Sequence, residues 1–216
     1  SYRCSGSTRI KIPSDATVIM RTPFVAYYHP TPKGNIGYLR IPHYSPEESD
    51  SDVNAYDLRF SQYEYAVAEL EKNTVGLVID QDHNCGGSVS YLFRMLSLFI
   101  PGSFVPTQFE LLASKESVVA FQGEIKEMEV LYRHTLDYTY VQNVLDIITK
   151  TWTETDNFLT PKTGIGSAPL IYANAHRYTK PIIVLVDEMS GSGGDAFPAM
   201  MQGNNRAKLL GTRTMG

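Results

Sequence analysis

Two apolar runs constrain the fold of this chain more than any other feature of its sequence. TVGLVID covers residues 74–80 and PIIVLVD covers residues 181–187, and each run ends in an aspartate. Continuous apolar runs of this length are typical of strands that are buried on both faces of a parallel sheet. A glycine-rich turn follows each run, CGG at 85–87 and SGSGG at 190–194. Because sites in open α/β sheets form at the carboxyl ends of the strands, we expect the two turns to lie side by side.

Helical periodicity alternates with these runs. Apolar residues at three- and four-residue spacing predict amphipathic helices over residues 56–73 and 141–152. Further helices are expected within 88–100 and, after a turn, within 190–202. Short strands are expected at 36–41 and 207–212, further strands at 104–114 and 117–123, and a loop at 161–169. The chain is therefore predicted to be α/β, with a largely parallel sheet flanked by helices and an irregular insertion.

The composition excludes several classes of function. The 216 residues carry a formal net charge of −4, so there is no basic excess to neutralise nucleic-acid phosphates. No apolar run reaches the roughly 18 residues that a membrane span needs. The 5 histidines show no metal-site spacing, and no cofactor is predicted. Cys4 and Cys85 are too few for a disulfide scaffold, and a bridge between them stays open.

The second glycine turn carries the strongest candidate for chemistry. Ser190 and Ser192 lie among glycines directly after a buried strand. An acyl-transfer enzyme needs a nucleophile and two N–H groups that point at the carbonyl oxygen, and glycine lets a ligand approach backbone N–H groups closely. From the local sequence alone, a nucleophilic Ser192 and a flexible glycine–serine loop are equally good interpretations.

Three blocks, in this order, resemble the C-terminal processing (tail-specific) serine peptidases. They are NIGYLRI, GLVIDQDHNCGG, and the long block from KPIIVLVDEMSGSGGDAF to TRTMG. The SGSGGD turn, the FPA start of the next helix and NNRAKLLGTRT are most similar to the branch that contains the tricorn core protease and the chlamydial protease-like activity factor. The resemblance implies a ClpP/crotonase-like protease core that hydrolyses peptide bonds of an extended polypeptide.

The resemblance also implies roles for individual residues. The family nucleophile stands three residues before the acidic residue that opens the helix, which is Asp195 in this chain. The nucleophile therefore falls on Ser192, with Ser190 as the alternative. The expected oxyanion donors are the backbone N–H groups of Gly193 and Gly86.

The general base is the missing part of this assignment. A serine hydroxyl needs an adjacent base to become a good nucleophile. The processing peptidases use a lysine directly after the position of Gly216, whereas the tricorn-like branch uses an upstream histidine that an acid beyond the nucleophile orients. We therefore expect residues 1–216 to be a protease core domain that is a fragment or a processed form, with 103–180 as an insertion or lid. A PDZ domain and the segment with the base are expected outside it, or on a separate chain that pairs with it.

Two histidines are internal alternatives for the base. His83 lies in the turn beside the expected oxyanion donor, and His43 follows the first strand block and could line a substrate cleft. Each also has an ordinary interpretation as a polar turn or loop residue. Asp82 stands where the family usually has arginine, so a substrate preference does not transfer from the family to this chain.

Two further expectations concern location and a different function. The resemblance implies secretion or a periplasmic location, although no signal peptide is visible at the N-terminus. The alternative function is a non-catalytic module that binds apolar ligands or peptides, because the interphotoreceptor retinoid-binding proteins resemble the same fold and carry apolar ligands.

Overall fold

Two compact units make up the structure. The computed structural model describes residues 10–45, 55–129, 136–155, 157–164 and 170–216. The first unit joins the chain up to Phe104 with Ile171–Gly216, and the second unit is Val105–Leu170.

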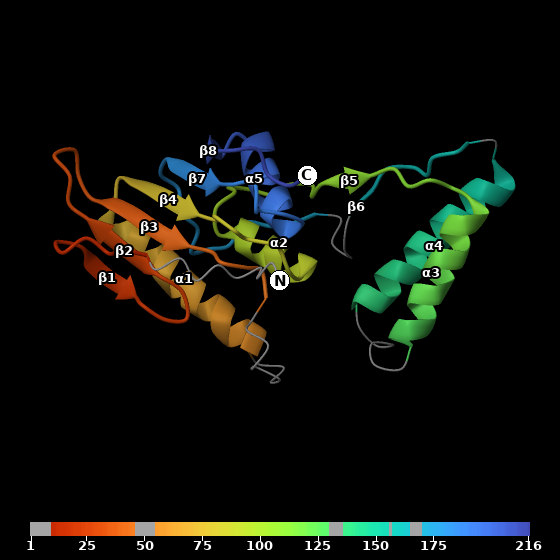
Figure 1. Ribbon diagram of the computed structural model, residues 1–216, viewed down its shortest axis with the longest axis horizontal. Coiled ribbons are helices and arrows are strands. Elements are labelled where there is room, and N and C mark those ends of the chain that lie inside the picture. The colour runs from red at the N-terminus through yellow and green to blue at the C-terminus, as the bar shows by residue number, and fades with distance from the viewer. Residues whose placement is uncertain (1–9, 46–54, 130–135, 156, 165–169) are drawn as a thin grey trace. The chain divides into compact units, whose positions relative to one another are not determined.

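A six-stranded sheet in the order β1-β2-β3-β4-β7-β8 organises the first unit (Figure 1). Its strands are β1 (Thr17–Met20), β2 (Ala26–His29), β3 (Ile36–Arg40), β4 (Gly76–Asp80), β7 (Ile182–Val186) and β8 (Ala207–Gly211). The pairs β3–β4, β4–β7 and β7–β8 are parallel, whereas β1–β2 and β2–β3 are antiparallel. Asp80 at the end of β4 lies beside Leu185 of β7, so these two strands end at the same edge.

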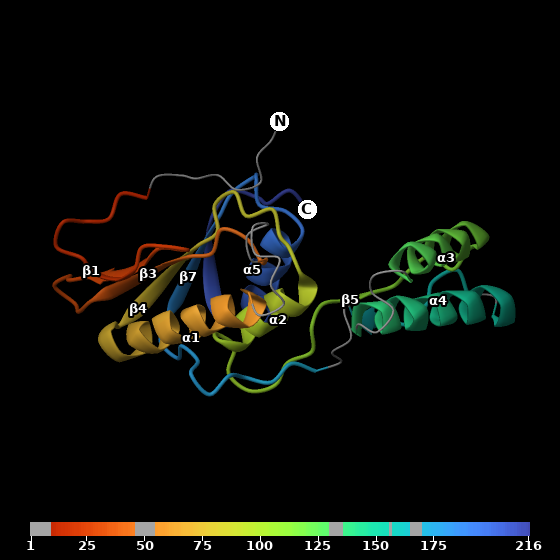
Figure 2. The same cartoon turned by 90° about the horizontal axis from the view of Figure 1, so that it is seen from below.

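Three helices complete the first unit: α1 (Ala55–Asn73), α2 (Val89–Ser97) and α5 (Gly193–Gly203). Helices α1 and α2 lie on one face of the sheet (Figure 2). The approach of α1 is close, because a Cβ atom on Gly37 of β3 would lie 2.7 Å from Leu70 Cδ2. The core between these layers is aliphatic, and Leu39, Ile79 and Val184 share one row of the sheet with no exposed surface.

A buried ion pair joins the carboxyl ends of β3 and β4. The Arg40 guanidinium donates to the Asp80 carboxylate and to the main-chain carbonyl of Asp82, and the Tyr38 hydroxyl donates to the other Asp80 oxygen. The Arg40 and Asp80 side chains are 5% and 11% exposed. Burial and the bond to Asp80 raise the pKa of Tyr38. Arginine from the neighbouring strand therefore holds the start of the first glycine turn.

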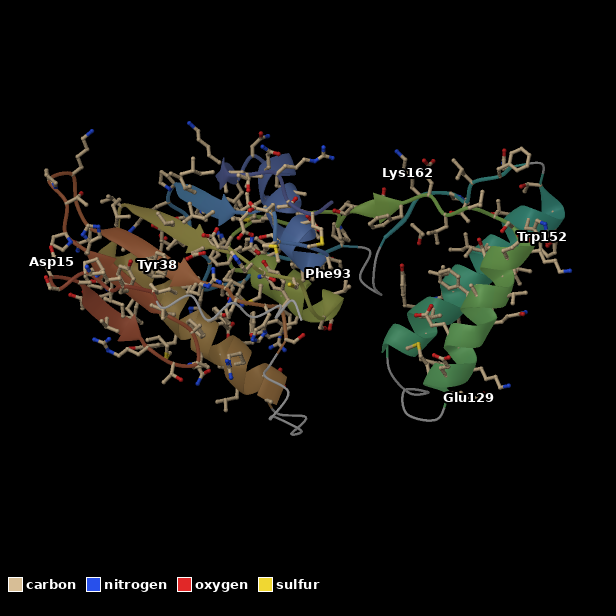
Figure 3. The ribbon with its side chains drawn as sticks, viewed as in Figure 1. Asp15, Tyr38, Phe93, Glu129, Trp152 and Lys162 are labelled. Carbon is tan, nitrogen blue, oxygen red and sulfur yellow. The ribbon has the colours of Figure 1, made fainter. Side chains whose placement is uncertain are left out.

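The second unit is a pair of packed helices, α3 (Lys115–Met128) and α4 (Leu136–Glu154). Val118, Val144 and Ile148 form its buried centre. Trp152 lies near the end of α4 and is 42% exposed (Figure 3). Two short strands, β5 (Gln108–Phe109) and β6 (Thr163–Gly164), pair antiparallel in the same unit. The insertion expected at 103–180 includes this second unit. In both units, none of the described helices is long and apolar enough to cross a membrane.

The α/β class is confirmed, but some expected elements are wrong. The strand expected at 117–123 lies inside α3, because the Ser114 side chain accepts the Ser117 N–H and caps a helix there. Within the strand expected at 104–114, only Gln108–Phe109 (β5) forms a strand. The antiparallel pair β1–β2 was not expected at all. Cys4 and residues 165–169 lie outside the described residues.

The buried ion pair gives a test of this arrangement. We expect Arg40→Met to lower the free energy of unfolding by about 3–5 kcal/mol, because Asp80 is left as a buried carboxylate without its cation. Urea denaturation measures the change. Arg21→Met at an exposed position is the control, and it should shift the free energy by less than about 0.5 kcal/mol. Equal shifts for both variants would contradict the role of the pair.

Candidate active site

The two glycine turns are in direct contact. A Cβ atom on Gly86 would lie 2.6 Å from the Gly193 nitrogen and 2.8 Å from Ser192 Cβ. The Gly191 N–H donates to the Asn84 carbonyl at 3.0 Å, and a Cβ atom on Gly194 would lie 1.9 Å from the same carbonyl oxygen. Such approaches leave no room for side chains, so glycine is required for the contact itself.

Ser192 is held in a conformation that serine rarely adopts. It is the residue before α5, with φ 54° and ψ −116°, and its side chain makes no capping hydrogen bond. The residue is exposed. A residue other than glycine in a sparsely populated backbone conformation costs about 1–3 kcal/mol, and such residues cluster at functional sites. The same kind of sharp strand-to-helix turn presents the nucleophile of α/β-hydrolases.

The backbone N–H groups near Ser192 differ in whether they donate a hydrogen bond to a described residue. The Gly193 N–H has no hydrogen-bond partner among the described residues. The Gly86 N–H donates to Asn84 Oδ1 at 2.8 Å, so this expected oxyanion donor is occupied in the structure. The next amide, that of Gly87, makes no hydrogen bond with any described residue. Of these two amides of the first turn, only that of Gly87 is without a hydrogen bond to a described residue.

A second link between the turns runs through Asp187, which follows β7 directly. Its carboxylate accepts the His83 backbone N–H at 2.9 Å and pairs with His83 Nδ1. It also accepts the Ser190 hydroxyl at 2.9 Å and the Met189 N–H at 3.2 Å. Burial alone would raise the pKa of Asp187, but these hydrogen bonds and the His83 charge lower it below its ordinary value. The carboxylate is therefore ionised across the neutral range.

The other candidates from the sequence do not hydrogen-bond the Ser192 hydroxyl. Ser190 has no exposed surface, and its hydroxyl bonds Asp187 or the Gln81 carbonyl, so the structure argues against it as the nucleophile. His83 is engaged with Asp187, and His43 Nδ1 accepts the Ser45 N–H at 3.3 Å. Cys85 is not a free thiol. No group of three metal-ligating side chains occurs in the described part of the chain.

Sequence reasoning missed the residues that support the turns. Asn84 has no exposed surface, and its side chain donates to the Ile41 carbonyl at 2.9 Å while it accepts the Gly86 N–H. Tyr44 is equally buried, donates to Gln81, and exchanges backbone hydrogen bonds with the first turn. Burial raises the pKa of Tyr44. The only signal for Asn84 was its place two residues before a glycine, where asparagine commonly bonds the backbone.

The last residues of the chain pack on the second turn. The Met215 N–H donates to the Ser190 carbonyl at 2.8 Å, and the Gly216 N–H donates to Asp195 Oδ1 at 3.2 Å. A cavity of about 400 Å³ begins at Asp195 and extends between α5 and β8, with Pro198 and Leu209 among its walls. An open groove therefore lies next to the helix that Ser192 opens.

The contact between the turns can be tested with one methyl group. Gly194→Ala places a carbon against the Asn84 carbonyl, so we expect the free energy of unfolding to fall by about 1–3 kcal/mol or more. Gly203→Ala is the matched control at the end of the same helix, where a Cβ atom meets nothing within 4 Å. Thermal or urea denaturation compares the two. A Gly194→Ala variant as stable as the control would contradict the close packing.

The lowered pKa of Asp187 predicts how stability depends on pH. An ionised Asp187 stabilises the folded state fully above the unfolded pKa of about 3.9, and this contribution is lost as the pH falls through the lower folded pKa. We expect the free energy of unfolding of the unmodified protein to fall more steeply than that of Asp187→Asn between about pH 5 and pH 2. Parallel curves would show that the carboxylate is not held by these bonds.

Comparisons with known proteins agree with this geometry. The model of Peptidase family S41 matches residues 35–216. A Chlamydia pneumoniae protein is 30% identical over 202 residues, which cover 84% of this chain and 32% of that protein. A Chlamydia muridarum protein is 27% identical over 200 residues, with 84% and 33% covered. This chain therefore spans about a third of the length of these relatives.

The match to the solved structure of mature CPAF covers 98% of this chain and 45% of the CPAF chain, with a TM-score of 0.72 and 25% sequence identity. A structure of mature CPAF complexed with lactacystin gives a TM-score of 0.70 and 26% identity. The family resemblance expected from the sequence is confirmed by these matches. Because the matched range includes both glycine turns and most of the residues, this chain belongs to peptidase family S41.

Proposed function

We propose that this chain forms the catalytic core of a serine endopeptidase and that Ser192 is its nucleophile. One observation carries the proposal: an exposed serine, held at a positive φ, stands at the contact of two turns beside the unengaged amide of Gly193. Membership of peptidase family S41 supports the same reaction. A flexible glycine–serine loop would have no reason to keep the serine in a strained conformation.

The proposed reaction follows from where these groups lie. Ser192 Oγ attacks the carbonyl carbon of the scissile peptide bond, and its proton passes to a general base. The carbonyl oxygen becomes negative and accepts the N–H groups of Gly193 and Gly87. The C–N bond then breaks, the leaving amine takes the proton from the base, and an ester to Ser192 remains. Water, deprotonated by the same base, hydrolyses this ester and restores the hydroxyl.

We place the general base outside the described residues. No described histidine or lysine hydrogen-bonds the Ser192 hydroxyl, and the imidazole of His83 is engaged with Asp187. A lysine directly after Gly216 and a histidine from an upstream segment both stay predictions.

The proposed substrate is a polypeptide in an extended conformation. Strand β8 ends the order of the six-stranded sheet, and its outer edge faces no other described strand. Addition of a peptide strand to an exposed edge supplies backbone hydrogen bonds without a sequence requirement. The cavity between α5 and β8 supports this placement near the second turn. Secretion or a periplasmic location and a separate partner chain stay predictions.

Covalent labelling tests the nucleophile. We expect a fluorophosphonate to label the full-length gene product at one serine, and we expect Ser192→Ala to abolish this labelling, because the reagent reacts with activated serines. Peptide mapping by mass spectrometry identifies the modified residue. Lactacystin, which has been solved in complex with mature CPAF, serves as a second probe.

Ser190→Ala is the matched control, since the two serines share one turn. It should keep the labelling, although it loses the bond to Asp187 and reacts more slowly. Labelling that survives Ser192→Ala would overturn the assignment. A full-length protein that no reagent labels would favour the non-catalytic binding module.

A further inference from the structure

One carboxylate collects donors from both glycine turns. Asp187 accepts the His83 backbone N–H from the first turn, and the Ser190 hydroxyl and the Met189 N–H from the second, and His83 Nδ1 lies against its other carboxylate oxygen. Three hydrogen bonds and the contact with the His83 imidazole therefore meet at this one carboxylate. The proposed reaction uses none of these side chains, so the cluster needs a separate explanation.

The backbone of His83 has an unusual conformation, and the pair is partly buried. His83 has a φ of 59°, which is uncommon for a residue other than glycine. The Asp187 side chain is 16% exposed and the His83 side chain is 42% exposed, so the pair is partly shielded from water and from salt screening. Asp82 and Glu188 are the acidic residues next to this pair in the sequence. The His83 backbone N–H donates to Asp187 and to neither of them.

His83 and Asp187 each lie a few residues before the part of their turn that forms the candidate site. His83 stands three residues before Gly86, and Asp187 stands five residues before Ser192. Both turns continue from this link toward the contact between Gly86 and Gly193. A change in the spacing at the link therefore alters the spacing between the hydroxyl of Ser192 and the amides of the opposite turn.

We propose that Asp187 and His83 are positioning residues: the contact between their side chains and the hydrogen bond from the His83 backbone N–H to Asp187 set the distance between the two turns and so hold Ser192 in line with its oxyanion donors. The inference rests on the proposed function of Ser192. It assigns no proton transfer to His83, whose Nδ1 lies against the Asp187 carboxylate. A misplacement of about 1 Å between reacting groups can lower a rate on the order of 100-fold, so a positioning pair has a large effect without touching the substrate.

The test measures the limiting rate of fluorophosphonate labelling and the reagent concentration that gives half of this rate, in the full-length protein. Asp187→Asn and His83→Ala are expected to lower the limiting rate about 100-fold and about tenfold, with little change in the half-saturating concentration. His83→Asn keeps a side-chain N–H near the place of Nδ1, so it should retain most of the rate. The double variant Asp187→Asn/His83→Ala should be no slower than Asp187→Asn alone, because both changes break one interaction.

Exposed residues of the same types supply the controls. Asp146→Asn in α4 and His176→Asn should leave the labelling rate unchanged. Thermal denaturation selects variants that are folded at the assay temperature, and His83→Ala carries the test if Asp187→Asn does not fold. A wild-type rate in folded Asp187→Asn or folded His83→Ala would overturn the inference. A His83→Asn variant as slow as His83→Ala would also overturn it, since imidazole chemistry would then be required. Failure of the proposed function is distinguishable, because the unmodified protein would not label at all.

Discussion

The structure of the candidate site depends on the contact between two turns that lie about a hundred residues apart in the sequence. The backbone atoms of Gly86 and Gly194 come so close to the opposite turn that a single methyl group at either of them would collide. The parallel register of β4 and β7 brings the turns to one edge, and the glycines allow them to touch. The rest of the site follows from this contact, because it brings Ser192 and the Gly193 amide against Gly86 of the first turn.

Several features of the site were accessible from the sequence for local physical reasons. Apolar runs 74–80 and 181–187 predict buried strands, and the glycines after them predict turns at the strand ends. Ser192 stood out because a hydroxyl in such a turn suits an exposed nucleophile. The order of the family blocks then separated Ser192 from Ser190, a choice that the burial of Ser190 supports.

Other features depend on contacts between distant residues, which a single sequence does not reveal. The pairing of His83 with Asp187 and the support of the turns by Tyr44 require the folded sheet. The engagement of the Gly86 amide by Asn84 is local, but a choice between Gly86 and Gly87 needs the direction of each N–H. In the second unit, the valines within 117–123 favoured a strand, and the cap at Ser114 favoured the helix that forms.

Two kinds of interaction hold the candidate site together. Packing of the glycine turns places Ser192, the proposed nucleophile, at their contact, and two links, Arg40 with Asp80 and His83 with Asp187, join the ends of neighbouring strands. Hydrogen-bond donors that are held in place before the reaction stabilise a developing negative charge without reorganisation during the reaction.

A crystal structure of the phosphonylated full-length protein tests the central claim most directly. The phosphonyl oxygen that mimics the oxyanion should lie about 2.7–3.1 Å from the amide nitrogens of both Gly193 and Gly87, with the phosphorus bonded to Ser192 Oγ. An adduct on another residue, or an oxygen that points away from the first glycine turn into solvent, would contradict the account.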